Sequence, residues 1–182
     1  MIFNLFGKKE EGTTGHIFTD RAYITTAAKM KACGELASKE PGSLFICWFA
    51  DTATIFKEFF RQQGLDENLV VETHHLHNAK IQGHKPVFVE HYPLHQNEIE
   101  LIKNWQQEKI IVYSAMDEPL FKHFGSEKII PLMKMMGMKE DEVIEHNMVS
   151  KSIISGQEKI AKQVTLEQKA SSQAGWMEKN LK

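Results

Sequence analysis

Hydrophobic and polar residues are distributed along this chain in a pattern that predicts strands and helices in alternation. The apolar run SLFICWF, residues 43–49, has the length of a strand and is typical of one covered on both faces of a parallel sheet. Residues 51–64 follow with their apolar side chains on one helical stripe, which predicts an amphipathic helix. The alternation continues to about residue 116 and predicts an α/β layer fold with right-handed crossovers.

Five strands and three helices are expected in this part of the chain. The expected strands are residues 16–24, 43–49, 69–73, 86–92 and 109–115, and the expected helices are residues 25–40, 51–64 and 96–107. In the second helix, Asp51 or Thr52 is the expected N-terminal cap. Gly64 is the expected end, and Ile55 is expected on the buried stripe together with phenylalanines.

After residue 116 the pattern becomes wholly helical. Two short helices are expected at residues 119–125 and 126–137, followed by one long helix from about residue 141 to 172. The long helix is charged except for one apolar stripe, which must lie on the domain or on another surface. The stripe comprises Val149, Ile153, Ile160 and Val164.

The composition fits one folded domain, since 42% of the 182 residues are hydrophobic and 25% are charged. The expected division is a flexible segment at residues 1–15, an α/β domain at 16–116, and a helical extension at 117–182 that packs on the same domain and frays at its C-terminus. The 22 basic and 24 acidic residues give a net charge of -2, which disfavours binding to nucleic acid.

Cysteine usage and hydropathy indicate the cellular setting. The chain has two cysteines, Cys33 and Cys47, in apolar or helical surroundings, which favours a reduced, cytoplasmic location. No run of 18 apolar residues is present that could span a membrane. The short apolar start, residues 1–6, allows at most a peripheral contact with a membrane or a partner.

Residues 112–160 carry the motifs VYSAMDEPLFKHFGS, LMKMMGM, EDEVIEHNMV and SGQEKI in that order. This series resembles the segment that follows the second ATPase domain of SecA, the bacterial preprotein translocation motor. Upstream, DRAYITTAAKMKA, SLFICWFADTATIFKEFFRQQG and HNAK resemble earlier parts of that ATPase domain, also in order. The resemblance implies a RecA-like domain of the helicase C-terminal kind, followed by the start of the long scaffold helix, with an ancestry in protein translocation.

The motifs with which that family handles nucleotide are absent. The sequence IQGHK, residues 81–85, stands where the family carries a strand and a Gly-Arg-Gly-Thr-Asp loop. Residues 94–109 contain no arginine or glycine, although the family places Gln-x-x-Gly-Arg-x-Gly-Arg there. No arginine follows Arg61 and no P-loop pattern occurs, while Asp117 and Glu118 are expected to begin a helix. The chain is therefore expected to be a pseudo-ATPase that binds no ATP.

Six histidines fall within 22 residues, namely His74, His75, His77, His84, His91 and His95. Imidazole is the commonest neutral metal ligand, so the first four are the candidates for a zinc site. On a strand, His75 and His77 would point to the same side. No carboxylate or cysteine stands at a recognised ligand spacing and no H-E-x-x-H pattern occurs, so a plain surface segment, or packing on aromatic neighbours such as Tyr92, is the alternative.

Methionines gather in residues 133–138, MKMMGM. Met133 and Met136 share a helical stripe with Ile129 and Leu132, which favours packing in the core. Methionine side chains adapt to irregular surfaces, so a groove for a partner is the second interpretation.

Together these patterns predict a non-catalytic module that binds a protein partner or a second copy of itself through the long helix, near the secretion machinery. The expected contact residues are Val149, Ile153, Ile160 and Trp176. An alternative is that the apolar stripe lies on the chain's own sheet. Two further alternatives are a subunit that completes an ATP site with a partner's P-loop domain, through Lys80 or Lys85, and a metal-dependent enzyme built on the histidines.

Overall fold

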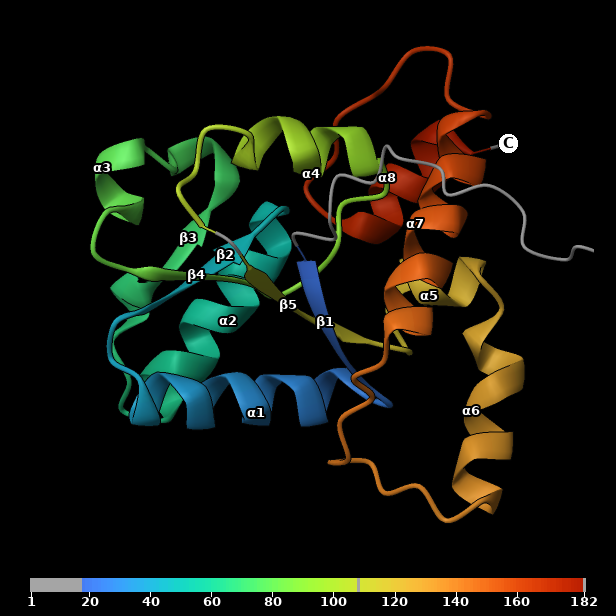
Figure 1. The fold of residues 1–182 in the computed structure, drawn as a ribbon, viewed down its shortest axis with the longest axis horizontal. Helices are drawn as coiled ribbons and strands as arrows, with labels where there is room; N and C mark the ends of the chain where they lie inside the picture. Colours follow the sequence, from blue (N-terminus) through green and yellow to red (C-terminus); the bar gives the residue numbers. More distant parts are fainter. Residues whose placement is uncertain (1–17, 108, 182) are drawn as a thin grey trace, which may run out of the picture.

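A single parallel sheet forms the centre of the computed structural model, which describes residues 18–107 and 109–181 (Figure 1). Within these residues the sheet has five strands in the order β1-β5-β4-β2-β3, and all neighbours pair in parallel. The strands are β1 (Phe18–Tyr23), β2 (Ser43–Cys47), β3 (Val70–Glu72), β4 (Lys85–Phe88) and β5 (Ile110–Ala115). This architecture confirms the RecA-like α/β class. The segment expected to be flexible, residues 1–15 with the apolar start 1–6, lies outside the described residues.

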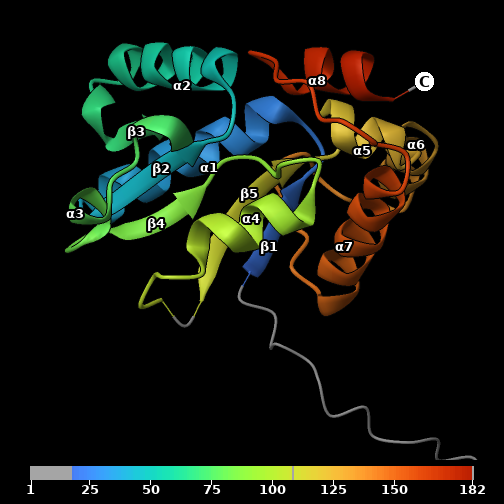
Figure 2. The same cartoon turned by 90° about the horizontal axis from the view of Figure 1, so that it is seen from above.

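Helices cover both faces of the sheet (Figure 2). The elements in this part of the chain are α1 (Thr26–Lys39), α2 (Ala50–Gln62), η1 (Glu67–Leu69), η2 (Thr73–His75), α3 (Asn78–Ile81) and α4 (His95–Ile102). Successive side chains of a strand point to opposite faces, so β2 places Phe45 and Cys47 in the core beneath α1 and α2. Its other apolar side chains, Leu44 and Ile46, lie in the core beneath α4. Burial on both faces is the reason why β2 is apolar from Leu44 to Cys47.

Helix α2 differs from the expectation at its start and on its buried face. Phe49 occupies the N-cap position without a side-chain hydrogen bond, so the expected capping by Asp51 or Thr52 is wrong. Ile55 was expected on the buried stripe but is 55% exposed, because only a narrow face of the helix, with Phe56 and Phe60, meets the sheet. Gly64 ends the turn after the helix with a φ of 68°, a conformation that suits glycine.

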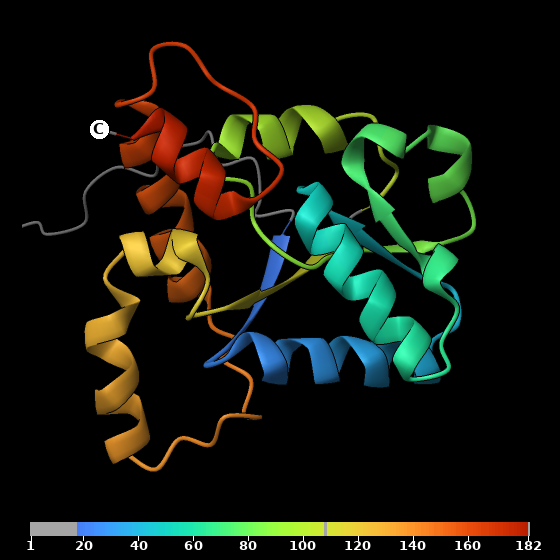
Figure 3. The ribbon, with the colours of Figure 1, turned by 180° about the vertical axis from the view of Figure 1, so that it is seen from behind.

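A helical extension follows the last strand and packs on the same domain. Its helices are α5 (Pro119–His123), α6 (Ser126–Met135), α7 (Asn147–Ala161) and α8 (Gln173–Asn180). Helix α7 lies against β1 and α4, and α8 lies against α5. Figures 1 and 3 show α6 at the outer side of the molecule, farther from the sheet than α5, α7 and α8.

The expectation of one long helix over residues 141–172 is wrong at both ends. At the start, Ile144 forms an antiparallel bridge with Ala22 of β1, and His146 caps α7 by accepting from the backbone N–H of Met148. At the end, the chain leaves α7 after Ala161 and folds back into α8, which buries Trp176 completely. A continuous helix of that length would extend about 48 Å and carry Trp176 away from the core.

A buried polar network joins the helical extension to the sheet. His91 follows β4, and its ring nitrogens contact Glu98 of α4 at 2.9 Å and Asp20 of β1 at 2.7 Å. Gln157 of α7 donates to Glu98 at 3.0 Å, and Gln173 of α8 donates to the carbonyl oxygen of His91 at 3.0 Å. All five side chains are buried. The network therefore connects β1, α4, α7 and α8 around the side chain and the backbone carbonyl group of His91.

Replacement of His91 by glutamine should lower the free energy of unfolding by about 3–5 kcal/mol, because it removes the charge partner of two buried carboxylates. Denaturant unfolding at pH 7 measures this loss. His95→Gln is the matched control, since the His95 side chain is 25% exposed and contacts Glu98 at 3.2 Å. An equal loss in both variants would contradict the role assigned to His91.

The same network predicts how stability depends on pH. Burial alone would lower the pKa of His91, but the carboxylates of Glu98 and Asp20 raise it from 6.5 to about 10. The folded protein thus keeps a proton that the unfolded chain releases near pH 6.5, and this stabilisation is lost as the pH rises through about 10. The unfolding free energy should fall over this range in the native protein and fall less in His91→Gln.

Candidate functional site

The sheet has a switch in strand order at its carboxyl edge, which is the place where open α/β sheets usually bind ligands. The chain passes from β2 outward to β3 and then returns to β4 on the other side of β2. The loops that follow β2 and β4 therefore diverge at this point. The described residues that gather here are Lys29 of α1, Thr52 of α2, Glu90 after β4, and Glu118 at the start of α5.

Glu90 fills the space between the ends of β2 and β4. One carboxylate oxygen accepts from the backbone N–H groups of Trp48 and Phe49, at 3.0 and 3.1 Å, directly ahead of α2. The other oxygen accepts from the hydroxyl of Thr52 at 2.8 Å. Backbone N–H groups at the start of a helix are suited to bind an anion. In this chain the anion is an internal carboxylate with only 4% of its residue surface exposed.

Lys29 and Glu118 form a buried ion pair beside Glu90. The Lys29 ammonium also donates to the carbonyl oxygen of Val89 at 2.6 Å, and it lies 5.5 Å from the centroid of the Phe56 ring. Burial raises the pKa of Glu90 to about 7, although Lys29 opposes that shift. Burial alone would lower the pKa of Lys29, but the carboxylates of Glu118 and Glu90 outweigh that effect and raise it. The only strong cation among these gathered groups is thus already paired with carboxylates of the chain.

The acids after β5 have structural partners, as the sequence predicts for residues that begin a helix. Asp117 accepts from the backbone N–H and the hydroxyl of Thr26, at 2.8 and 2.7 Å, and so holds the first turn of α1. Glu118 is the N-cap residue of α5. Both carboxylates are thus engaged within the chain, Asp117 with Thr26 and Glu118 with Lys29.

Helix α8 lies across this carboxyl edge beside α5 (Figure 3). Gln173 accepts from the backbone N–H of Leu120 at 2.8 Å, and the carbonyl oxygen of Ser171 accepts from the N–H of Asp51 at 2.9 Å. Trp176 is completely buried, and its indole N–H donates to Glu167 at 2.8 Å. The chain's own C-terminal segment thus covers the edge of the sheet at which ligands of this fold class usually bind.

Both arginines and the two lysines proposed to complete an ATP site are paired or lie away from Glu90. The two arginines of the chain, Arg21 and Arg61, form ion pairs with Glu145 and with Glu58 and Glu67. Lys85 pairs with Glu40 at 2.7 Å, at the amino end of β4 and thus at the edge opposite to Glu90. Lys80 lies on the surface in α3. These positions give no support to an ATP site completed through Lys80 or Lys85.

Both cysteines are structural. Cys33 and Cys47 are free and completely buried. Burial raises the pKa of Cys33 to about 12 and that of Cys47 well above its ordinary value. A thiol that stays protonated is not a nucleophile, so neither residue is a catalytic candidate.

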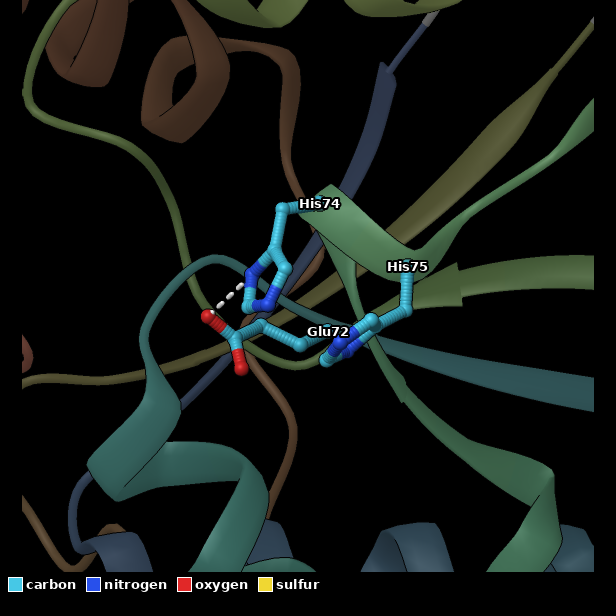
Figure 4. Close-up of side chains that lie close together, drawn as sticks. All are labelled: Glu72, His74 and His75. Atoms are coloured by element: carbon cyan, nitrogen blue, oxygen red, sulfur yellow. Dashed lines mark ion pairs between the residues drawn. The ribbon is translucent and has the colours of Figure 1, made fainter.

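The structure places four of the six clustered histidines in two separate groups. His91 and His95 contribute to the buried network, whereas His74 and His75 lie on the surface with Glu72 at the end of β3 (Figure 4). Ligand atoms of these last three residues all lie within 4.8 Å of one another. Among the described residues, His77 and His84 do not join this group. Sequence analysis missed Glu72 because its position two residues before His74 matches no recognised ligand spacing.

Most of the α6 stripe that was expected in the core is exposed. Ile129, Leu132 and Met136 are 46%, 56% and 80% exposed, whereas Met133 is half-buried. Met135, which was not part of that stripe, is 85% exposed. The expectation that this stripe packs in the core is therefore wrong. The physical reason is that the loop after α6 returns directly to β1, where Ile144 pairs with Ala22, so that no other element within residues 18–107 and 109–181 covers the stripe.

A groove of about 820 Å³ lies beside α6, between α5 and α7. Its apolar lining residues are Met116, Phe121, Phe124, Ile129, Met148, Val149 and Ile153, and its basic lining residues are His123, Lys151 and Lys159. Gly156 permits α7 to approach α5, since a Cβ atom there would lie 2.4 Å from the ring of Phe124. No carboxylate lines this groove among the described residues.

The four residues expected to contact a partner occupy different environments. Val149 is half-buried and lines the groove, and Ile153 lies at its floor with 2% of its surface exposed. Ile160 and Trp176 are completely buried in a cluster with Leu120. The apolar stripe of α7 thus packs on the chain's own domain, and only its first part reaches a surface depression.

The fold defines a RecA-like α/β domain with a helical extension, and comparison with known proteins relates part of it to SecA. No family model matches the chain. The protein translocase subunit SecA of Acidithiobacillus ferrooxidans is 48% identical over 48 residues, which is 26% of this chain and 5% of that protein. SecA of Acinetobacter baumannii is 42% identical, and SecA of Christiangramia forsetii 48% identical, each over 48 residues. The matches thus cover only about a twentieth of the length of these relatives.

Among the helices that the structure describes, none is both long and apolar enough to cross a bilayer.

Glu90 provides a test of the filled carboxyl edge. Its pKa rises from 4.5 to about 7 on folding, so the folded state holds a proton that the unfolded chain has released. Stability should therefore fall as the pH rises from 4.5 through 7, by about 2–3 kcal/mol for this group. The Glu90→Gln variant should lose the part of this pH-dependent fall in stability that is due to Glu90. The control variant Glu58→Gln, at an exposed residue, should show the same fall as the native protein. Denaturant unfolding at pH 5 and pH 8 measures the difference, and equal changes in all three proteins would contradict the assignment.

Proposed function

We propose that this chain is a non-catalytic, SecA-like module that binds a protein partner and acts in connection with protein translocation. The observation that carries the proposal is the exposed apolar face of α6 beside a groove with basic residues. The 48-residue similarity to SecA supports the link with translocation. A cytoplasmic location belongs to the same proposal, and the two free, buried thiols are consistent with a reducing compartment.

The pseudo-ATPase part of the proposal rests on the carboxyl edge of the sheet. Glu90 binds the backbone N–H groups ahead of α2, Lys29 is paired with Glu118, and α8 lies across the same edge. A nucleotide phosphate at this position would meet a buried carboxylate instead of free N–H donors and a free cation. The motifs of the SecA family that are absent from the sequence agree with this interpretation.

The partner surface consists of the exposed side chains of α6 and the adjoining groove. Four large apolar side chains, Ile129, Leu132, Met135 and Met136, are exposed on one short helix. Contiguous apolar patches on soluble domains usually mark interaction sites. Methionine side chains can adjust to the shape of a partner, and α7 offers Val149 at the edge of the same depression.

The charges of the groove indicate the chemistry of the partner. Lys151 and Lys159 line it, and no carboxylate does among the described residues. Complementarity therefore favours an amphipathic helix of another protein that has an apolar face flanked by aspartate or glutamate. A second copy of this chain would bring equal basic charges together at the groove, which disfavours a symmetric dimer through this surface.

A photo-crosslinking amino acid at Met135, introduced in the native host, should yield a discrete adduct with another protein. The matched control is the same amino acid at Ile55, which is an exposed apolar residue on the surface of α2. The adduct at Met135 should weaken in the Lys151→Glu, Lys159→Glu double variant, because the basic groove is then acidic.

Three results would contradict the proposal: equal labelling from Met135 and Ile55, an adduct with the mass of two copies of this chain, or an adduct indifferent to the charge reversal. Thermal unfolding of each variant serves as the folding control.

A further inference from the structure

The end of β3 carries a cluster of potential metal ligands that the proposed function does not use. We propose that Glu72, His74 and His75 bind a divalent transition-metal ion of the zinc class. Figure 4 shows the three side chains close together at the end of the strand, with the carboxylate of Glu72 turned toward the ring of His74. Ligand atoms from all three lie within 4.8 Å of one another.

The distances in the cluster are close to those of a coordination shell. A carboxylate oxygen of Glu72 lies 2.6 Å from Nδ1 of His74, and the ring centroids of His74 and His75 are 3.8 Å apart. Zinc binds nitrogen and oxygen at about 2.0–2.2 Å, so two ligand atoms on one ion are separated by roughly 3–3.5 Å. The cluster reaches that separation by rotating side chains about their own bonds. His74 has room for this movement because 59% of its side chain is exposed.

The backbone beneath the ligands is fixed by the sheet. Glu72 is the last residue of β3 and lies in register with Cys47 of the buried strand β2. The next residues form the one-turn helix η2. A hydrogen bond of 3.1 Å closes this turn, from the backbone N–H of Leu76 to the carbonyl oxygen of Thr73. A tight turn anchored to a strand holds the three Cα atoms in place, so the ion has little backbone to order.

The ligand types select the kind of ion. Imidazole nitrogens suit zinc, cobalt, nickel and copper, whereas calcium and magnesium require oxygen ligands. Two histidines and one glutamate are three protein ligands, which leaves at least one coordination position open. Since His74 and His75 are both on the surface, the open position faces solvent and is accessible to water, an anion or a side chain of another protein.

The test is titration of the purified chain, with any affinity tag removed, with Zn²⁺ alone in a calorimeter and with Co²⁺ monitored by visible absorption. One equivalent should bind, and cobalt should give ligand-field bands. His74→Ala and His75→Ala should each weaken zinc binding by about 10-fold or more. His77→Ala is the matched control, because His77 is exposed and lies two residues away but outside the cluster, and it should bind as the native chain does.

Absence of zinc binding in the native chain would overturn the proposal, and so would binding that persists in His74→Ala and His75→Ala. An equal loss in His77→Ala would also overturn it, since it would show diffuse association with surface imidazoles. Circular dichroism of each variant establishes that the fold is retained. The outcome is independent of partner binding at α6, which involves other elements of the chain.

Discussion

The attachment of the helical extension to the carboxyl edge of the sheet determines the rest of this structure. His91 lies between two buried carboxylates, Asp20 and Glu98, while Gln157 and Gln173 bring α7 and α8 onto the same network. Breaking hydrogen bonds of buried polar groups costs free energy, so these contacts favour one position of the helices on the sheet. The apolar cluster around Trp176 then closes over the edge. One set of contacts thus determines how α7 and α8 pack and places α8 over the carboxyl edge.

A second set of contacts places charged residues of the chain at the carboxyl edge of the sheet, and the proposed function therefore rests on the outer helices. Glu90 accepts from backbone N–H groups ahead of α2, and Lys29 pairs with Glu118, in the place where an α/β sheet usually receives a ligand. In contrast, α6 exposes its apolar face, and no other element that the structure describes lies over it. A domain arranged in this way can contribute to a process by holding a partner. That arrangement is consistent with a SecA-like segment that lacks the nucleotide motifs of its family.

The strands of the sheet could be predicted from the sequence because the pattern that marks each strand is local. Apolar runs bounded by turns gave all five strands, and the order of motifs gave the class. The long helix was overestimated because its end depends on Trp176 returning to the core, which no local pattern encodes. The stripe of α6 has the period of a buried face, and only the tertiary structure shows that Ile129, Leu132 and Met136 are exposed. Glu72 became a ligand candidate only through the turn that brings His74 and His75 to it.

The most direct test of the account is thermal unfolding with and without millimolar Mg-ATP or Mg-ADP. A ligand at 100 times its dissociation constant adds about 2.7 kcal/mol to the stability of the folded state. In a chain of this size, that stabilisation would raise the unfolding midpoint by roughly 5–10 °C. The account predicts no rise with either nucleotide, because the chain's own residues fill the carboxyl edge. A clear rise would contradict it and would show that nucleotide binding survives without the family's motifs.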